Sequence, residues 1–528
     1  MAKQYDADVI VVGSGAVGSN LANELAKQGK SVIMLEAGPK VERWKLIENF
    51  RNSPRKFDFN EPFPNNPWAQ TSYAKNYIEN TGTFNMLPGM LKLVGGTTWH
   101  WGGATWRYLP NDMKLKTMYG VGRDWPIEYS ELEPYYHRAE VEIGVSGSDS
   151  EDQSGQGGEA FPPRSAPYPV DPEPPLYLTT HFKNKLEKKG YNFVHEPNIR
   201  THVPYDGRPA CQGNNNCAPV CPIGALYNGS IHAEKSVRNG VKLITEAVAY
   251  KIEKGADRKI DAIHYKTPHG DDVRLQAKYF VIAAHSFETA KLLLLSDVAN
   301  SSDQVGRNLM DHTGINMHFL TDEPVWMGRG PVQQTGIFNW RDGAFRSEHS
   351  AIKHTITNLN PQLMLTQRFL SQGMMGKELD DNIRHYSERW AEVSTFFEAL
   401  PDPNNRVMPS TTHKDALGIP TLTVHYDVDN YIRRGAEAAK QQYKDIVRNM
   451  SGTYIETTDF VNHDHLMGTM IMGDNPKDSV VDKDCRTHDH PNLFIASVGV
   501  IPAAGVVNPT LTAIALAIRS ADIIAREI

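Results

Sequence analysis

The chain has 528 residues, more than one ordinary hydrophobic core serves, so we expect two large lobes. Its formal charge is −7 and it has no strong basic block, which excludes typical nucleic-acid binding because phosphate affinity needs clustered Lys and Arg. It has no run of about 18 apolar residues, so the sequence predicts no direct membrane span.

The first segment with a chemical signature opens on a short apolar strand, residues 9–12. Three glycines follow in the pattern G-x-G-x-x-G: Gly13, Gly15 and Gly18. The first two let the backbone turn and approach a pyrophosphate, and the third lets helix and strand pack. A helix and a second strand, residues 31–35, lead to Glu36, whose carboxylate can accept hydrogen bonds from a ribose hydroxyl. This order predicts a dinucleotide site, because an ordinary strand-to-helix turn leaves Glu36 unexplained.

A second glycine-rich segment, LVGGTTWHWGGATW, spans residues 93–106 and follows a loop-rich stretch at 40–90. Four residues there suit a bound dinucleotide, two by close backbone approach and two by hydroxyl hydrogen bonds: Gly95, Gly96, Thr97 and Thr98. His100 lies among three tryptophans and is by default a packed or hydrogen-bonded side chain.

The next stretch carries helix and linker signals. Ser130, with Glu133 three residues on, predicts a capping box at the start of a helix. Residues 146–175 are rich in Gly, Ser, Gln and Pro, which favours a flexible or polyproline-like linker.

A cysteine loop, residues 210–229, contains three of the four cysteines: Cys211, Cys217 and Cys221. Their spacings of six and four, with Pro222 after the last, are typical of thiolates around an iron–sulfur cluster, and three ligands fit a [3Fe-4S] centre. Two alternatives stay open: incidental buried thiols, or a structural zinc site with His202 or His232 as fourth ligand. Cys485 is expected to be an ordinary cysteine.

The remaining chain alternates between the two expected lobes. Residues 241–265 predict a hairpin or meander, and residues 278–296 predict a second strand of the nucleotide-binding sheet followed by a helix. Residues 315–455 suit a substrate lobe with an antiparallel sheet. Near the end, a strand at 492–497 precedes a loop and a helix at 506–526.

Together these segments resemble the glucose–methanol–choline (GMC) flavin oxidoreductases. The motifs that carry the resemblance span nearly the whole chain in the family's order: GSGAVG with Glu36, GGTTWHW, VIAAHSFETAKLLLLS, VGRNLMDH, HLMGTMIMG and VVNPTLT. The cysteine loop makes the chain similar to the catalytic flavoprotein subunits of bacterial membrane-associated sugar and sugar-acid dehydrogenases. Gln212 departs from close relatives, which often carry a second cysteine there.

The resemblance implies an α/β fold in which a Rossmann-like FAD-binding domain is interleaved with an α+β substrate domain carrying an antiparallel sheet. It assigns 1–50, 88–110, 200–314 and 456–528 to the FAD-binding domain. It assigns 51–87, 111–199 and 315–455 to the substrate-binding domain and linkers.

The resemblance also implies the cofactor and the reacting residues. FAD is the expected dinucleotide, contacted in addition by Val248, Pro509 and Thr510. His465 and Asn508 are placed at its reactive face, and His100 falls where some relatives attach the flavin covalently. A neutral imidazole suits a general base near pH 7, and Asn508 can hold the same hydroxyl. Without the family, a core histidine and a turn asparagine would be the expected readings.

The implied reaction is oxidation of a sugar or sugar-acid hydroxyl by hydride transfer to FAD, with electrons passed through the [3Fe-4S] cluster. The implied partners are a membrane-bound multihaem cytochrome c subunit and a small subunit bearing the export signal. The first residues run directly into a strand and leave no room for a signal peptide, so we expect cytoplasmic protein when the chain is expressed alone. With its partners we expect the periplasmic face of the inner membrane.

Two other functions remain open from sequence. One is an oxygen-using GMC oxidase with zinc in the cysteine loop, and the other is a non-catalytic flavin-binding electron carrier. Arg329 and Lys353 could recognise a substrate carboxylate, although exposed surface is the expected place of each.

Overall fold

The computed structural model describes residues 5–54 and 60–528. The predicted ranges 1–50 and 51–87 include residues 1–4 and 55–59, which lie outside the described residues. Strand β1 (Ala7–Val12) lies near the centre of the first sheet, as its unbroken apolar run predicts. It pairs in parallel with β2 (Val32–Leu35) and β8 (Asp272–Ile282), so Val12 lies between Leu35 and Ile282.

The rest of this sheet comes from later parts of the chain. Strand β5 (Lys242–Ile244) joins β2, and β16 (Leu493–Ile495) joins β8, both in parallel. Strands β6 (Val248–Lys254) and β7 (Ile260–Lys266) extend the sheet beyond β8 as an antiparallel meander. The alternating pattern of residues 241–265 therefore predicted this region correctly.

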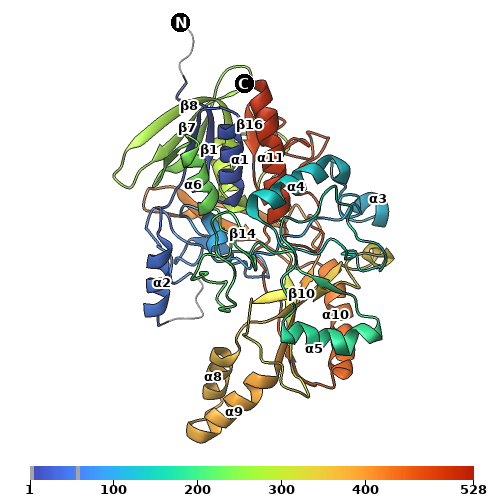
Figure 1. The fold of residues 1–528 in the computed structure, drawn as a ribbon. Helices are drawn as coiled ribbons and strands as arrows, with labels where there is room; N and C mark the ends of the chain where they lie inside the picture. The colour runs from blue at the N-terminus through green and yellow to red at the C-terminus, as the bar shows by residue number, and fades with distance from the viewer. Residues whose placement is uncertain (1–4, 55–59) are drawn as a thin grey trace.

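Helices cover the parallel part of the sheet (Figure 1). Helix α1 (Ala16–Lys27) packs against α11 (Thr510–Glu527) and α6 (Ser230–Arg238), and α11 packs against α4 (Tyr129–Ile143). Helix α7 (Ser286–Ser296) follows β8 directly, as expected for residues 278–296. No helix in the described ranges is both long and apolar enough to cross a lipid bilayer.

The second sheet has the strand order β15-β9-β12-β11-β10-β4 and is antiparallel throughout. Its strands are β4 (Phe193–His195), β9 (Gly314–Leu320), β10 (Gln333–Ile337), β11 (Ile352–Thr357), β12 (Trp390–Phe397) and β15 (Thr453–Thr457). Helix α10 (Asn430–Asn449) packs against β9 and β12, and α5 (Tyr177–Leu186) packs against α10. The antiparallel sheet expected within 315–455 is present, and the predicted fold class is confirmed.

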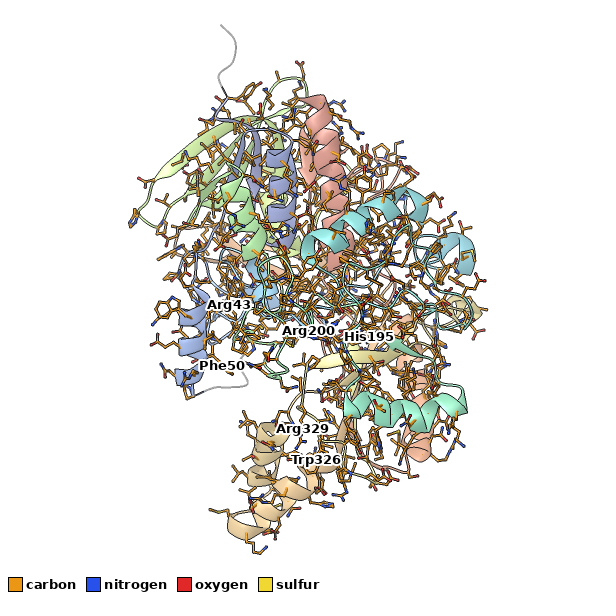
Figure 2. All side chains as sticks on the ribbon, in the orientation of Figure 1. Arg43, Phe50, His195, Arg200, Trp326 and Arg329 are labelled. Atoms are coloured by element: carbon orange, nitrogen blue, oxygen red, sulfur yellow. The ribbon has the colours of Figure 1, made fainter. Side chains whose placement is uncertain are left out.

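A third, small sheet has the order β13-β14-β3, formed by β13 (Arg406–Lys414), β14 (Pro420–His425) and β3 (Ile78–Asn80). Helices α8 (Gln362–Ser371) and α9 (Gly376–Arg389) form an arm at the lower end of the molecule (Figure 1). Near this arm Arg329 is exposed and lies over the Trp326 ring, 5.0 Å from its centroid (Figure 2). The surface position expected for Arg329 is confirmed.

Two local expectations were wrong: the capping box at Ser130 and the flexible linker at 146–175. The stretch 40–90 contains α2 (Arg43–Asn52) as well as loops. Helix α4 begins one residue before Ser130, and its capping box is formed by Glu128 and Glu131, because the chain already turns helical at Tyr129. A short helix α3 (Leu115–Tyr119) precedes it.

Residues 146–175 are irregular, but they are not a flexible spacer. The Ser146 amide donates to the Asn198 carbonyl at 2.8 Å, and the Tyr168 ring is buried. Buried aromatic area and backbone pairing fix this segment against the body of the protein.

Candidate active site

A cavity of about 500 Å³ lies between residues of both large sheets. Most of the predicted site residues line it: Gly13, Gly15, Glu36, Gly96, Thr97, Thr98, His100, Val248, His465, Asn508, Pro509 and Thr510. Its volume and its mixed apolar and polar wall suit a large organic ligand. The structure therefore brings together segments that are far apart in the sequence.

Gly18 and Gly95 do not line the cavity. At each of them another backbone segment comes too close to leave room for a Cβ atom. A Cβ at Gly18 would lie 2.2 Å from the Gly13 carbonyl oxygen, so only glycine lets α1 approach the loop. Gly95 has φ of 97°, and a Cβ there would lie 2.6 Å from the Ser230 amide. Both glycines shape the site from outside.

The beginning of α1 suits an anionic group. Gly15 is its N-cap and provides no side-chain cap, so the first amides of the helix lack partners within it. A Cβ on Gly15 would meet nothing within 4 Å, which means that the protein leaves space beside this glycine. An unsatisfied helix start at an open space is what a dinucleotide diphosphate requires, so these residues fit FAD.

Glu36 follows β2 directly and lies in the cavity wall. One carboxylate oxygen accepts from the Ser14 amide at 3.1 Å and the Ser14 hydroxyl at 2.6 Å, and the other accepts from the Gly38 amide at 3.0 Å. Burial raises the pKa of Glu36, and these hydrogen bonds oppose the rise. A carboxylate has about four acceptor positions, so one remains for a ribose hydroxyl.

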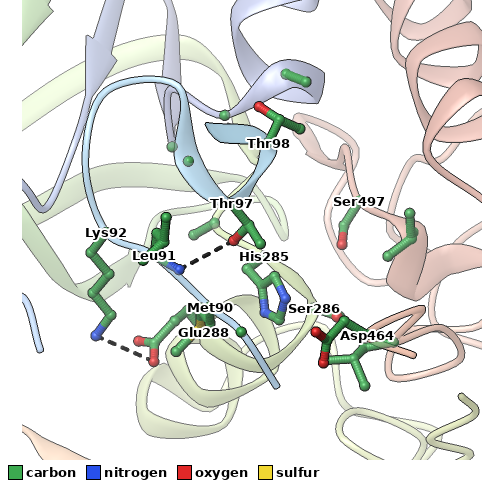
Figure 3. Close-up of a pocket in the computed structure, with 18 of the residues that line it drawn as sticks. Met90, Leu91, Lys92, Thr97, Thr98, His285, Ser286, Glu288, Asp464 and Ser497 are labelled. Atoms are coloured by element: carbon green, nitrogen blue, oxygen red, sulfur yellow. Dashed lines mark hydrogen bonds and ion pairs between the residues drawn. The ribbon is translucent and has the colours of Figure 1, made fainter. Parts of the chain in front are cut away.

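The two threonines of the second glycine segment differ in what their hydroxyls can still do (Figure 3). Thr98 Oγ1 donates to the Gly95 carbonyl at 2.7 Å and accepts from the Gly229 amide at 2.8 Å. Thr97 Oγ1 accepts from the Leu91 amide at 3.2 Å and keeps its proton to donate. Thr97 is therefore the better hydrogen-bond donor to a ligand.

His100 points one ring nitrogen at the backbone. Its Nε2 lies 2.7 Å from the Gly89 carbonyl oxygen, which can only accept, so Nε2 carries the proton. Burial lowers the pKa of His100 to about 4, so the ring is neutral and its Nδ1 keeps a lone pair.

His465 and Asn508 face each other in the same cavity. The Asn508 side-chain amide Nδ2 lies 2.8 Å from His465 Nε2. His465 lies in the loop that follows β15, and Asn508 lies in the turn that leads into α11. This contact joins the two residues that the resemblance paired.

A second histidine fixes the tautomer of His465. His312 Nε2 lies 3.2 Å from the Ala504 carbonyl and 3.1 Å from the Gly505 carbonyl, so it carries the proton. His312 Nδ1 is then an acceptor, and His465 Nδ1, 2.8 Å away, must donate to it. His465 Nε2 is left with a lone pair, which accepts from Asn508. The hydrogen bonds therefore leave Nε2 of His465 as the ring nitrogen that can accept a proton.

The electrostatics keep His465 neutral. Burial lowers its pKa well below the usual value, and the nearby His312, Lys353 and His463 act in the same direction. Burial lowers the pKa of His312 to about 3 and that of His463 to about 4. An uncharged His465 can accept a proton over the whole physiological range.

Asp311 holds the loop that carries His465. Its carboxylate accepts from the His463 amide at 2.9 Å and from the His465 amide at 2.8 Å. Burial raises the pKa of Asp311 to about 7, with the neighbouring Asp464 carboxylate contributing. The ring of Phe396 lies 5.8 Å from the His465 ring and stacks on it, which limits rotation of the imidazole.

Sequence reasoning did not place three further residues in this group: Asp311, His312 and Lys353. The first two belong to the quoted motif VGRNLMDH, but nothing local relates them to His465, 153 positions away from His312. Lys353 was expected at the surface, yet its exposed fraction is 1% and its Nζ donates to Asn508 Oδ1 at 2.8 Å. It lies on β11, in the interior of the second sheet.

The cysteine loop is anchored at both sides. The Arg43 guanidinium donates to the Cys221 carbonyl at 2.9 Å, and the Asn215 amide donates to the Gly330 and Asn358 carbonyls at 3.0 and 2.6 Å. Cys217 is buried, and Cys211 and Cys221 are half-buried. Among residues 5–54 and 60–528, however, no three His, Cys, Asp or Glu side chains are arranged to hold a metal ion. As placed, the thiols do not form a metal site.

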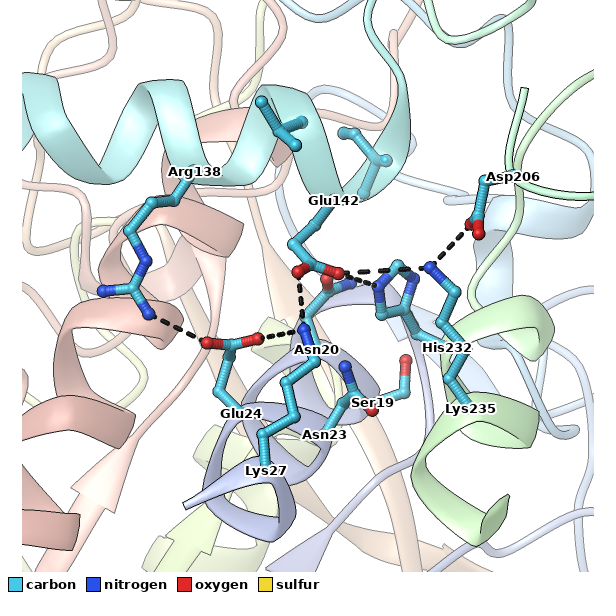
Figure 4. A network of polar contacts seen from close by, with 12 residues as sticks. Ser19, Asn20, Asn23, Glu24, Lys27, Arg138, Glu142, Asp206, His232 and Lys235 are labelled. Atoms are coloured by element: carbon cyan, nitrogen blue, oxygen red, sulfur yellow. Dashed lines mark hydrogen bonds and ion pairs between the residues drawn. The ribbon is translucent and has the colours of Figure 1, made fainter. Parts of the chain in front are cut away.

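His232, one of the two histidines considered for zinc, belongs to a polar network between helices (Figure 4). Its Nε2 lies 3.1 Å from Glu142, and its Nδ1 lies 2.8 Å from the Tyr227 hydroxyl. Glu142 also pairs with Lys27 of α1 at 2.6 Å. With both nitrogens engaged, His232 serves helix packing rather than the cysteine loop.

Comparison with known proteins shows the family of the chain. Two sequence profiles described as GMC oxidoreductase match residues 214–314 and 401–517. The fructose dehydrogenase large subunit of Gluconobacter japonicus is 45% identical, over 99% of this chain and 98% of that protein. The gluconate 2-dehydrogenase flavoprotein of Pantoea cypripedii is 23% identical, over 98% and 94% of the two chains.

A solved structure has the same fold. Formate oxidase from Aspergillus oryzae, in the R554A variant studied for FAD modification, superimposes with a TM-score of 0.66, covering 100% of this chain and 99% of that one at 14% identity. The full-length relationship at 45% identity decides the family. The chain belongs to the GMC oxidoreductases, a family of FAD-binding oxidoreductases.

Proposed function

We propose that this protein is an FAD-dependent dehydrogenase that oxidises a hydroxyl group of a sugar or sugar acid. The observation that carries the proposal is the 2.8 Å contact between Asn508 Nδ2 and the unprotonated Nε2 of His465, in the cavity that the glycine loop also lines. Bound FAD would supply the acceptor for the hydride that leaves the substrate carbon.

The protein's own residues would manage the proton and the orientation. A substrate hydroxyl placed between His465 and Asn508 would give its proton to His465 Nε2, the only lone pair on that ring directed at the amide. Asn508 would hold the same oxygen and thereby fix the direction of the carbon–hydrogen bond. We therefore propose His465 as the proton acceptor and Asn508 as the residue that orients the substrate.

For the substrate we propose a neutral ketose first and an aldonic acid second. The relative at 45% identity is named a fructose dehydrogenase, whereas the one named for gluconate is 23% identical. The cavity wall contains Gln333, whose Nε2 donates to Glu196 at 2.7 Å. Its carbonyl oxygen is then the atom of that amide suited to accept from a sugar hydroxyl.

Anaerobic bleaching of the flavin absorbance tests the function. We expect fructose to bleach it faster than glucose, gluconate or 2-ketogluconate, and His465→Ala to slow bleaching by about 100-fold or more. Failure of every sugar and sugar acid to bleach the wild-type flavin would reject the proposal in favour of a carrier role. Stoichiometric peroxide in air would favour the oxidase alternative.

We also propose that His100 is the attachment point of a covalently bound FAD. Its neutral ring with a lone pair on Nδ1, in the cavity wall, supports this. Acid precipitation tests it: the pellet should stay yellow for the wild type and become colourless for His100→Ala. A colourless wild-type pellet would reject the bond.

The [3Fe-4S] cluster remains part of the proposal, supported by the spacing of Cys211, Cys217 and Cys221 in one anchored loop. The side chains as placed do not fit a bound metal, so no step of the reaction is derived through a cluster.

We propose further that the chain works with a membrane-bound cytochrome c subunit and a small export subunit at the periplasmic face of the inner membrane. The relative at 45% identity is named a large subunit, which supports assembly with at least one other chain. Co-expression with and without genes for small partner subunits, followed by fractionation, tests this. Export of the chain expressed alone would contradict it.

A further inference from the structure

A buried lysine of the second sheet reaches the pair at the centre of the cavity. Lys353 is on β11, and its Nζ donates to Asn508 Oδ1 at 2.8 Å. Its Nζ also lies 4.2 Å from the centroid of the Phe396 ring and 5.9 Å from that of Trp106. A lysine with an exposed fraction of 1% costs free energy to bury, so its retention inside the protein needs a reason.

We propose, on the basis of the proposed alcohol oxidation, that Lys353 is a positioning residue that fixes the Asn508 amide and keeps His465 in its unprotonated form. In its charged form Lys353 has only donors, so the atom of Asn508 facing it is then the carbonyl oxygen. The Asn508 amide group is then turned toward His465 Nε2. A hydrogen-bonded chain thus runs from Lys353 through Asn508 and His465 to His312.

The two ends of this series of hydrogen bonds require the same protonation state of His465 Nε2. From one end, the Ala504 and Gly505 carbonyls require a lone pair on His465 Nε2, through His312. From the other end, Lys353 requires that Asn508 offer hydrogens to the same nitrogen. Neither end alone fixes the whole chain, because an isolated asparagine amide can turn over and present its oxygen to a protonated histidine.

The charge of Lys353 acts in the same direction as its hydrogen bond. Burial lowers the pKa of Lys353 to about 7, Arg341 contributes to that fall, and Glu196 opposes it. In its charged form Lys353 disfavours a positive charge on His465, on His312 and on His463, as the lowered pKa of each reflects. Two acidic groups lie near the His465 loop: Asp311, which accepts from the His465 amide, and Asp464, which helps to raise the pKa of Asp311. The neutral amine can still donate to Asn508 Oδ1 but also carries a lone pair, so loss of the Lys353 proton removes the charge and weakens the constraint on the Asn508 amide.

Two substitutions separate these effects. Lys353→Met keeps an unbranched side chain, one atom shorter, but removes both the donor and the charge. Lys353→Gln removes the charge but keeps an N–H donor, on a side chain that is one atom shorter. Thr355→Val is the matched control, since Thr355 is buried two residues along the same strand and takes no part in the hydrogen bonds that join Lys353, Asn508, His465 and His312.

The rate of anaerobic flavin reduction at saturating fructose, measured against pH, gives the first readout. We expect Lys353→Met to lower this rate by roughly 10-fold to 100-fold, because a displaced Asn508 misplaces the substrate oxygen. The acid limb of the pH–rate profile should move to higher pH, because loss of the neighbouring positive charge raises the pKa of His465. Lys353→Gln should recover most of the rate at high pH while keeping the shifted limb, and Thr355→Val should match the wild type.

A second readout does not depend on any substrate. In protein labelled with ¹⁵N-histidine, the ring signals assigned through His465→Asn should show a neutral Nδ1–H tautomer in the wild type. Lys353→Met and Lys353→Gln should both raise the pH at which His465 becomes charged. If no sugar reduces the wild-type flavin, the proposed function fails while this titration still reports on Lys353. The inference would be overturned if Lys353→Gln left the rate of flavin reduction, the acid limb of its pH profile and the His465 titration unchanged. This test holds even if Lys353→Met does not fold.

Discussion

His312 Nδ1 and His465 Nδ1 lie 2.8 Å apart, and the proton between them belongs to His465 because backbone carbonyls occupy the other side of His312. The proposed base is therefore directed by another imidazole rather than by a carboxylate. A neutral partner orients the ring without stabilising its charged form, unlike the aspartate of a serine-protease triad.

This geometry predicts different effects for two substitutions of His312. His312→Leu removes the acceptor of the His465 Nδ1 proton, so the wrong tautomer becomes populated and the maximal rate of flavin reduction should fall by roughly 10-fold to 100-fold. His312→Asn offers a carbonyl oxygen to the same proton and should retain more activity. Rapid-mixing kinetics with saturating sugar measure the difference. Equal losses in both variants would mean that His312 acts by packing alone.

The sequence predicted the features whose physics is local. Gly13, Gly15 and Gly18 lie within six positions, and the space each needs is set by the turn they form, so their roles were readable. The His312–His465 contact joins positions 153 apart and depends on the path of the whole second sheet. Family resemblance supplied His465 and Asn508, but not the groups that direct them.

Lys353 shows why the remainder was not predictable. Lysine is usually exposed, and nothing in the segment IKHTIT identifies which of its residues faces the cavity. All six residues of β11 are buried, because its neighbours β10 and β12 and the elements on both faces enclose it. A central strand of polar residues does not show the alternation on which strand-face assignment depends.

Asp311 should make stability depend on pH. Its folded pKa of about 7 lies above the unfolded value, so the folded state binds the extra proton and stability is lost as pH rises from about 4 to about 7. The loss attributable to this group is at most about 4 kcal/mol. Asp311→Asn cannot titrate and should flatten this part of the curve, as denaturant unfolding between roughly pH 4.5 and 7.5 would measure. Asp464→Asn, at a carboxyl with a pKa of about 6, should flatten it less. An Asp311→Asn curve parallel to the wild type would contradict the prediction.

The two glycines of the first loop should fail in different ways. Gly18→Ala places a Cβ 2.2 Å from the Gly13 carbonyl oxygen and 2.9 Å from the Ala283 Cβ, so the helix must move and stability should fall by about 1–3 kcal/mol. Gly15→Ala meets no protein atom within 4 Å and has an ordinary φ of −65°, so stability of the flavin-free protein should be unchanged.

Flavin retention separates the same pair. The Cβ of Gly15→Ala occupies the space beside the uncapped start of α1, so this variant should lose FAD on gel filtration while remaining folded. If FAD is covalently bound through His100, its retention should be measured in the His100→Ala background, in which no such bond can hold it. Full flavin retention by Gly15→Ala would show that the diphosphate does not approach this turn.

The cysteine loop gives the last prediction. If it holds a [3Fe-4S] cluster, protein purified without air should contain about three iron atoms per chain, and Cys217→Ser should lose them. Cys485→Ser is the control, because Cys485 is also buried but lies outside the loop. Burial raises the pKa of Cys485 to about 12, which disfavours the thiolate that a metal requires.

The thiols as placed do not form a metal site, so cluster formation would require the side chains of this loop to turn toward one another. The backbone anchors from Arg43 and Asn215 leave that freedom, since they hold carbonyls and not sulfur atoms. Absence of iron, with zinc at one atom per chain or with no metal at all, would reject the cluster and leave the proposed chemistry at His465 and Asn508 intact.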